Sequence, residues 1–115
     1  MGRKQQRKGR AGELELASVL RSHGISAEAG QAVSFGLTPD VIGVDGIHVE
    51  CKRVERLNVS EAMNQAVRDS IKFKDGFPTL FHRRNRNPWL VTMTLDDWLK
   101  LYKKYTETLK NTDRG

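Results

Sequence analysis

Apolar residues recur at helical spacing in three stretches of the chain. An apolar residue at every third or fourth position marks one buried face of a helix. The stretches predicted to be helical are residues 9–23, 58–71 and 95–105. Gly24 is placed to end the first helix, and Asn58 and Thr94 are placed to cap the other two. We expect the last helix to bury a face formed by Leu95, Trp98, Leu99 and Tyr102.

Alternation of apolar and polar residues predicts strands between these helices. The stretch "PDVIGVDGIHVECKRV", residues 39–54, is typical of a β-hairpin that turns at Asp45-Gly46. A short strand is expected within residues 25–38, and "FPTLFHR" and "PWLVTM" predict two more. This order favours an α/β or α+β fold with a mixed central β-sheet flanked by helices. The second helix would cross over between two parallel strands.

The length of 115 residues suits a single domain. We place it at residues 9–105, where the periodic patterns lie. Residues 1–8 are predicted to form a flexible basic arm, and residues 106–115 a fraying tail.

Positive charge is concentrated in two segments of the chain. The net charge is +6, and basic residues gather in "MGRKQQRKGR" and "HRRNRNP". Such clusters favour a polyanionic partner, DNA above all, although a solubilising surface or a disordered tail is the alternative. The predicted DNA contacts are Arg3, Lys4, Arg7, Lys8, Arg10, Arg83, Arg84 and Arg86.

Other features of the composition exclude several classes of protein. No apolar run reaches the roughly 20 residues of a membrane span, and no hydrophobic segment follows the basic N-terminus. One cysteine cannot form an internal disulfide, and one cysteine with three scattered histidines lacks the spacing of a zinc site. We expect an intracellular protein, in the cytoplasm or, for a phage protein, the host cytoplasm, without a membrane partner or small-molecule cofactor.

The strongest chemical signal is the polar face of the hairpin. Glu50 and Lys52 share one face of "IHVECKRV", and Asp40 begins the preceding strand. A loop of three residues ending at Gly46 would pair Asp40 with Glu50, whereas a two-residue turn would place them on opposite faces. Two converging carboxylates suit Mg²⁺, and a neighbouring lysine can stabilise charge on a phosphate. The alternative is a solvated strand face with a surface ion pair.

Two residues besides Asp40 and Glu50 bear on the hypothesis of a metal site: Glu13 and His48. Glu13 lies within the apolar stripe of the first helix, so its carboxylate needs a partner, whereas Glu15 points elsewhere as an ordinary solvated residue. The alternative for Glu13 is stabilisation by the helix dipole. His48 shares the face of Glu50, and we expect it on the hairpin surface.

Four segments together resemble the PD-(D/E)xK nuclease superfamily, and within it the small Holliday junction resolvases of archaeal and phage type. "KGRAGELELASVLRSHG" is similar to the opening helix with its glutamate, and "PDVIGV" to the motif with the metal-binding aspartate. "VECK" is similar to the Glu-x-Lys motif, and "NQAV" carries the glutamine of many members. The usual aliphatic residue of the Glu-x-Lys motif is Cys51 here. The resemblance implies a restriction-endonuclease-like αβββαβ core.

The resemblance also implies a role for each matched residue. Asp40, Glu50 and the backbone carbonyl of Cys51 would bind Mg²⁺, for which Mn²⁺ could substitute. Glu13 would bind a second ion or its water shell. Lys52 would position the attacking water, Gln65 would orient Lys52 or a phosphate, and Ser34 would line the substrate groove.

The predicted activity is therefore metal-dependent hydrolysis of phosphodiester bonds near a four-way DNA branch point, as part of recombination or repair. Symmetric cleavage of such a junction calls for a homodimer, with apolar residues of the later strands and last helix as candidates for its surface. Two alternatives stay open. The same chemistry could act on duplex ends, flaps or restriction-like targets, or the chain could be a DNA-binding module with an unused site.

Overall fold

Three helices and one five-stranded sheet make up the described chain. The computed structural model describes residues 2–30 and 38–114, and the side chains of residues 9–30 and 38–112. In order, the elements are α1 (Gly2–Ser22), β1 (Glu28–Ala29), β2 (Val41–Ile42), β3 (Ile47–Arg53), α2 (Val59–Phe73), β4 (Phe77–Arg83), β5 (Leu90–Met93) and α3 (Leu95–Arg114). The predicted α+β class and its αβββαβ order are confirmed.

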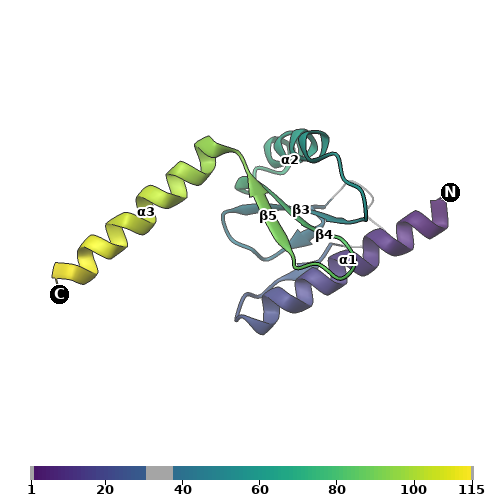
Figure 1. Ribbon diagram of the computed structural model, residues 1–115, viewed down its shortest axis with the longest axis horizontal. Helices are drawn as coiled ribbons and strands as arrows, with labels where there is room; N and C mark the ends of the chain where they lie inside the picture. The colour runs from purple at the N-terminus through teal and green to yellow at the C-terminus, as the bar shows by residue number, and fades with distance from the viewer. Residues whose placement is uncertain (1, 31–37, 115) are drawn as a thin grey trace.

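The sheet is mixed, and its strands follow one another in chain order. Only the β3–β4 pair is parallel, from Ile47 opposite Phe77 to Arg53 opposite Arg83. Helix α2 connects these two strands, as a parallel pair requires. Figure 1 shows α1 and α2 on opposite sides of the sheet.

The apolar core lies mainly between α1 and the sheet. Leu16 and Ala17 of α1 pack with Val41 and Val49, which point to this face of β2 and β3. Because side chains alternate along a strand, the neighbours His48 and Glu50 face the other side, toward α2. The alternation of β3 therefore separates its core face from its polar face.

Helix ends follow the predicted capping residues. The Asn58 side chain accepts a hydrogen bond from the Glu61 backbone N–H at 3.1 Å, and Thr94 Oγ1 accepts one from Asp97 at 3.3 Å. At the other end of α2, Lys74 is left-handed, and its N–H donates to the Ser70 carbonyl at 2.8 Å. These local contacts fix where α2 starts and stops, and hence which of its residues reach the sheet.

Both terminal helices are longer than predicted. Helix α1 begins at Gly2 rather than near residue 9, and α3 continues to Arg114 instead of fraying from residue 106. The arm and the tail lack apolar periodicity, but they contain no proline, and their arginine, lysine and glutamine residues are good helix formers. The predicted bounds of the two helices were therefore too short, and the flexibility of the arm and the tail stays a prediction.

Helix α3 also departs from its predicted burial. It extends away from the sheet (Figure 1), and Leu95, Trp98 and Tyr102 are 68%, 46% and 47% exposed. The Trp98 and Tyr102 rings stack on each other, 5.0 Å apart. The amphipathic pattern was read correctly, but in the described chain its apolar face is exposed. None of the described helices is long and apolar enough to cross a membrane.

Candidate active site

The hairpin register brings Asp40 and Glu50 to the same face. Val41 pairs with Val49, so Asp40 comes opposite Glu50, as the three-residue loop predicts. Gly46 has a φ of +79°, the left-handed conformation expected at the end of that loop. Asp40 Oδ2 accepts a hydrogen bond from the Cys51 backbone N–H at 2.8 Å, which fixes the carboxylate beside β3.

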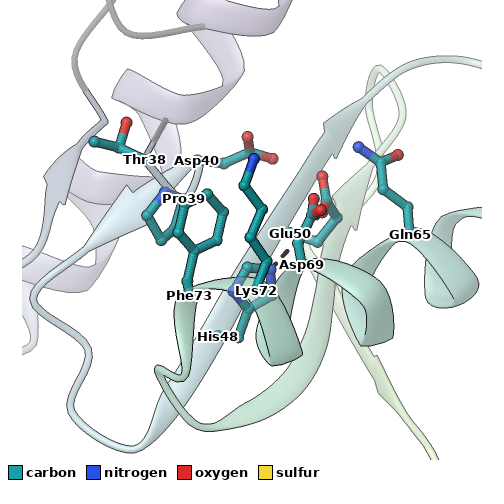
Figure 2. A pocket seen from close by; sticks show the side chains of 9 residues that line it. All are labelled: Thr38, Pro39, Asp40, His48, Glu50, Gln65, Asp69, Lys72 and Phe73. Carbon is teal, nitrogen blue, oxygen red and sulfur yellow. Dashed lines mark ion pairs between the residues drawn. The ribbon is translucent and has the colours of Figure 1, made fainter. Parts of the chain in front are cut away.

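A pocket of about 290 Å³ opens between this face of the hairpin and helix α2. Three of the predicted site residues, Asp40, Glu50 and Gln65, contribute to its wall (Figure 2). Its full lining is Thr38, Pro39, Asp40, His48, Glu50, Gln65, Asp69, Lys72 and Phe73. Strand β3 and helix α2 thus supply most of a polar cavity.

The carboxylates of Asp40 and Glu50 shift each other's pKa in opposite directions. Burial raises the pKa of Asp40 from its ordinary value of 3.8 to about 8, and the charge of Glu50 adds to the rise. Burial also raises the pKa of Glu50, but His48, Asp40 and Lys52 outweigh it and the net shift is downward. Glu50 is therefore the ionised member of the pair near neutral pH.

Glu13 and Lys52 complete the predicted cluster. Burial raises the pKa of Glu13, and Arg10, Glu50 and Lys52 are near enough to change it. Arg10 lies 3.8 Å from the Glu13 carboxylate, and its guanidinium also donates to the Gly30 carbonyl. Helix α1 therefore brings a third acid to Asp40 and Glu50, as its place in the apolar stripe predicts.

Cys51 takes no part through its sulfur. The side chain packs against the core beside α1, and burial raises the pKa of the thiol far above its usual range. A thiol that stays protonated is a poor nucleophile. Any contribution of Cys51 to the pocket comes from its backbone, whose N–H already orients Asp40.

His48 lies in the interior and not on the hairpin surface. It is only 1% exposed, because α2 and the Asp75 loop cover the polar face of β3. Asp69 and Lys72 also line the pocket, and the sequence reasoning missed both. Their spacing is the signal that could have found them: they follow Gln65 by four and seven residues, which places all three on one face of α2.

A second acidic residue of α1, Glu15, binds two arginines. Its carboxylate accepts hydrogen bonds from Arg53 at 3.3 Å, from Arg83, and from the Trp89 indole at 3.1 Å. Burial would raise the pKa of Glu15, but Arg83 and Arg53 outweigh it and lower the pKa. Glu15 is therefore not the ordinary solvated residue that was expected, and Arg83 has its charge paired within the protein.

The remaining residues predicted to contact DNA differ in how exposed their side chains are. Arg84 and Arg86 are exposed in the loop between β4 and β5, where their side chains are accessible to a partner. Arg10 is half-buried beside Glu13. Ser34 lies outside the described residues, as do the side chains of Arg3, Lys4, Arg7 and Lys8. Comparison with protein-family models and with curated proteins gave no match.

Proposed function

We propose that the chain is a metal-dependent endonuclease that hydrolyses phosphodiester bonds in DNA, with four-way junctions as its preferred substrate. The observation that carries the proposal is the convergence of Asp40 and Glu50 on one polar pocket, where burial and the charge of Glu50 raise the pKa of Asp40. Buried carboxylates in this state favour a bound cation.

The donor set fits Mg²⁺ or Mn²⁺. Carboxylate and carbonyl oxygens are the ligands that these hard cations prefer, and Asp40, Glu50 and the Cys51 carbonyl would hold the first ion. Glu13 would hold a second ion or the water around the first. A bound divalent ion supplies Lewis acidity toward a phosphate oxygen and lowers the pKa of a coordinated water.

The residues around the ion would divide the remaining tasks. Lys52 follows Glu50 by two residues on the same strand face, where its ammonium would stabilise negative charge on the phosphate. Gln65 would orient the phosphate or the water from α2. The water oxygen would bond to phosphorus, the bond from phosphorus to the 3′ oxygen would break, and the 3′ oxygen would take up a proton.

Support for a branched substrate comes from the resemblance to junction resolvases and from the basic loop. The exposed Arg84 and Arg86 suit phosphate contacts that position DNA without reading its sequence. A homodimer would present two sites to a junction. Exposed apolar residues on β5 and α3, including Val91 at 59% and Trp98 at 46%, offer a surface for it.

The test is cleavage of a synthetic four-way junction, a linear duplex and a flap, each with Mg²⁺ or EDTA. We expect paired nicks near the branch point of the junction, which disappear with EDTA and in Lys52→Ala. Faster cleavage of the duplex or flap would assign the same chemistry to another substrate. Binding of all three without cleavage, unchanged in Lys52→Ala, would identify a binding module and contradict the proposal.

A further inference from the structure

The histidine inside the pocket is held in one orientation. His48 Nδ1 lies 2.9 Å from both carboxylate oxygens of Asp75, and the His48 ring stacks on Phe73 with its centroid 6.1 Å away. A carboxylate at Nδ1 favours the tautomer whose proton is on that nitrogen. When His48 is neutral in this tautomer, the lone pair of Nε2 is available on the opposite side of the ring, and a metal ion would compete with the proton that Asp75 and Glu50 favour.

Nε2 of His48 is buried without a hydrogen-bond partner. Among the side-chain nitrogen and oxygen atoms that the structure describes, it is the one in this condition. Buried polar atoms are nearly always satisfied, so an exception calls for a ligand or a functional role. The nearest carboxylate oxygen is Glu50 Oε1 at 3.9 Å, which is too long for a hydrogen bond.

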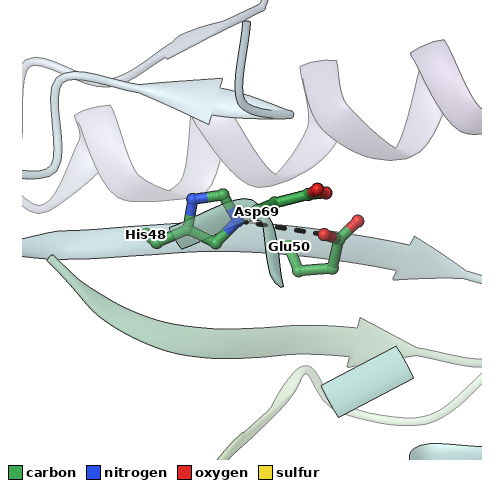
Figure 3. Close-up of side chains that lie close together, drawn as sticks. All are labelled: His48, Glu50 and Asp69. Carbon is green, nitrogen blue, oxygen red and sulfur yellow. Dashed lines mark ion pairs between the residues drawn. The ribbon is translucent and has the colours of Figure 1, made fainter. Parts of the chain in front are cut away.

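Two carboxylates face this nitrogen from different elements. One ring nitrogen of His48 and one oxygen each from Glu50 and Asp69 lie within 4.8 Å of one another, and Figure 3 shows the three side chains together. Metal–ligand bonds of about 2.0–2.2 Å place two ligand atoms of one ion up to about 4.2 Å apart. The Glu50–His48 distance of 3.9 Å falls within that limit, which applies to ligands on opposite sides of an ion, and the Asp69 oxygen lies within 4.8 Å of both atoms.

We infer that His48, Glu50 and Asp69 form a second cation site, which selects a transition metal. An imidazole donor with two carboxylates favours Mn²⁺, Co²⁺ or Zn²⁺ over Mg²⁺, which prefers oxygen ligands alone. Glu50 lies between this site and Asp40. Each of its two carboxylate oxygens can therefore coordinate a different ion. Asp75 is a positioning residue, because it acts on the ion only through the imidazole.

This inference goes beyond the proposed nuclease activity, and the two can fail separately. Neither His48 nor Asp69 belongs to the proposed catalytic set, and metal binding is measured without DNA. A chain that cleaves DNA with Mg²⁺ but does not bind Co²⁺ through His48 would contradict only the second site. A chain that binds Co²⁺ through His48 but cleaves no DNA would contradict only the nuclease.

The first experiment is a Co²⁺ titration of the full chain, followed by visible absorption, with Zn²⁺ added in a parallel ¹⁵N NMR titration of the three histidines. We expect saturable cobalt absorption bands and a Zn²⁺-induced shift of His48 Nε2, with Nδ1 keeping its proton. The inference would be overturned if His48 carried a proton on Nε2 and its ¹⁵N shifts did not change on addition of Zn²⁺. The ring would then be an imidazolium paired with Glu50.

Two variants and two controls complete the test. Asp69→Asn and His48→Gln should each weaken Co²⁺ binding by about 10- to 100-fold. Asp69 is only half-buried, so its variant keeps the test valid if His48→Gln does not fold. Asp97→Asn and His82→Gln, which change a half-buried aspartate and a histidine bonded to Thr92, should leave the affinity unchanged. Equal Co²⁺ affinity in Asp69→Asn and the unmodified chain would overturn the site.

Discussion

Glu13 and Glu15 belong to the same helix, two positions apart, yet they enter opposite electrostatic surroundings. Successive helical residues are rotated by about 100°, so the two side chains leave α1 in very different directions. Glu15 is held by Arg53 and Arg83, and its pKa is lowered. Glu13 faces Glu50 and Asp40, and its pKa is raised. In one cluster ion pairs lower the pKa of the acid, and in the other burial raises it.

We interpret this contrast as the difference between a structural acid, Glu15, and an acid of the proposed site, Glu13. The Glu15 cluster connects α1 to β3 and β4 through paired charges, so its benefit is present in the isolated chain. The Asp40–Glu50 pair concentrates carboxylates where burial penalises their charged forms, and a bound cation would offset that cost under the proposed function.

The largest expected difference is in DNA cleavage. Glu50→Gln should lower the rate on a four-way junction by about 10³-fold, because it removes a metal-binding charge at the centre of the pocket. Glu15→Gln should change the rate by less than about threefold in protein that stays folded. The rates are measured with Mg²⁺ in excess, and Glu28→Gln, at an exposed glutamate of β1, is the matched control. Equal losses in the Glu50 and Glu15 variants would remove the distinction between the clusters.

The next largest difference concerns the free energy of unfolding without divalent ions. Substitutions in the two clusters should change it in opposite directions. At pH 8 in EDTA, Asp40→Asn should raise the free energy of unfolding by about 1–2 kcal/mol, because it removes a buried charge but keeps the acceptor for the Cys51 N–H. Glu15→Gln should lower it by about 1 kcal/mol, since Glu15 is one-third exposed and its ion pairs are partly screened.

Urea unfolding measures both changes, with Asp45→Asn, in the exposed turn, as the control that should stay within about 0.5 kcal/mol. A loss of stability in Asp40→Asn would show that the pocket is already compensated by its own residues.

The pH dependence of the unmodified chain should show the same contrast. The raised pKa of Asp40 means that the folded state holds more protons than the unfolded chain between about pH 4 and 8, and the raised pKa of His48 adds to this difference above its ordinary value of 6.5. Their contribution is fully present at low pH and is lost as the pH rises through this window. Glu15, with its lowered pKa, contributes above its ordinary value and is lost on further acidification.

We therefore expect the free energy of unfolding in EDTA to fall by about 1–2 kcal/mol from pH 5 to pH 8, and to fall less in Asp40→Asn. Urea unfolding at four or five pH values provides the measurement. An increase in stability over this range would contradict the raised pKa of Asp40.

The smallest effect is expected at the basic loop. Arg84→Gln should weaken binding of all DNA forms by about two- to fivefold, and should reduce the slope of log affinity against log salt by about one. Arg83→Gln would not test DNA contact alone, because it would also break the ion pair between Arg83 and Glu15. Fluorescence anisotropy over a salt series makes the measurement, and a loss limited to one DNA form would indicate readout of shape or sequence instead.

Local sequence signals predicted the hairpin turn, the strand face and the helix face that surround the candidate site. Asp45-Gly46 fixed the turn, alternation placed Glu50 and Lys52 together, and the apolar stripe of α1 singled out Glu13. These features depend on residues near in the chain, where backbone geometry leaves few options.

What the sequence could not show depends on contacts between distant elements. His48 alternates like a surface residue, and its burial follows from the position of α2 over the sheet. Glu15 meets Arg83 only because β3 and β4 pair across the helical crossover. An amphipathic pattern also says nothing about what covers it, so the exposed apolar face of α3 could not be foreseen.

The most direct test of the central claim is a Mn²⁺ titration at pH 8, with free Mn²⁺ followed by electron paramagnetic resonance. The chain should bind Mn²⁺ saturably. Asp40→Asn should bind Mn²⁺ at least about tenfold more weakly at the Asp40–Glu50 site, which leaves the ion held through His48 and Asp69, and Glu15→Gln should bind it as the unmodified chain does. Equal binding by Asp40→Asn and the unmodified chain, or no binding by either, would contradict the claim that the Asp40–Glu50 pocket is built to hold a divalent cation.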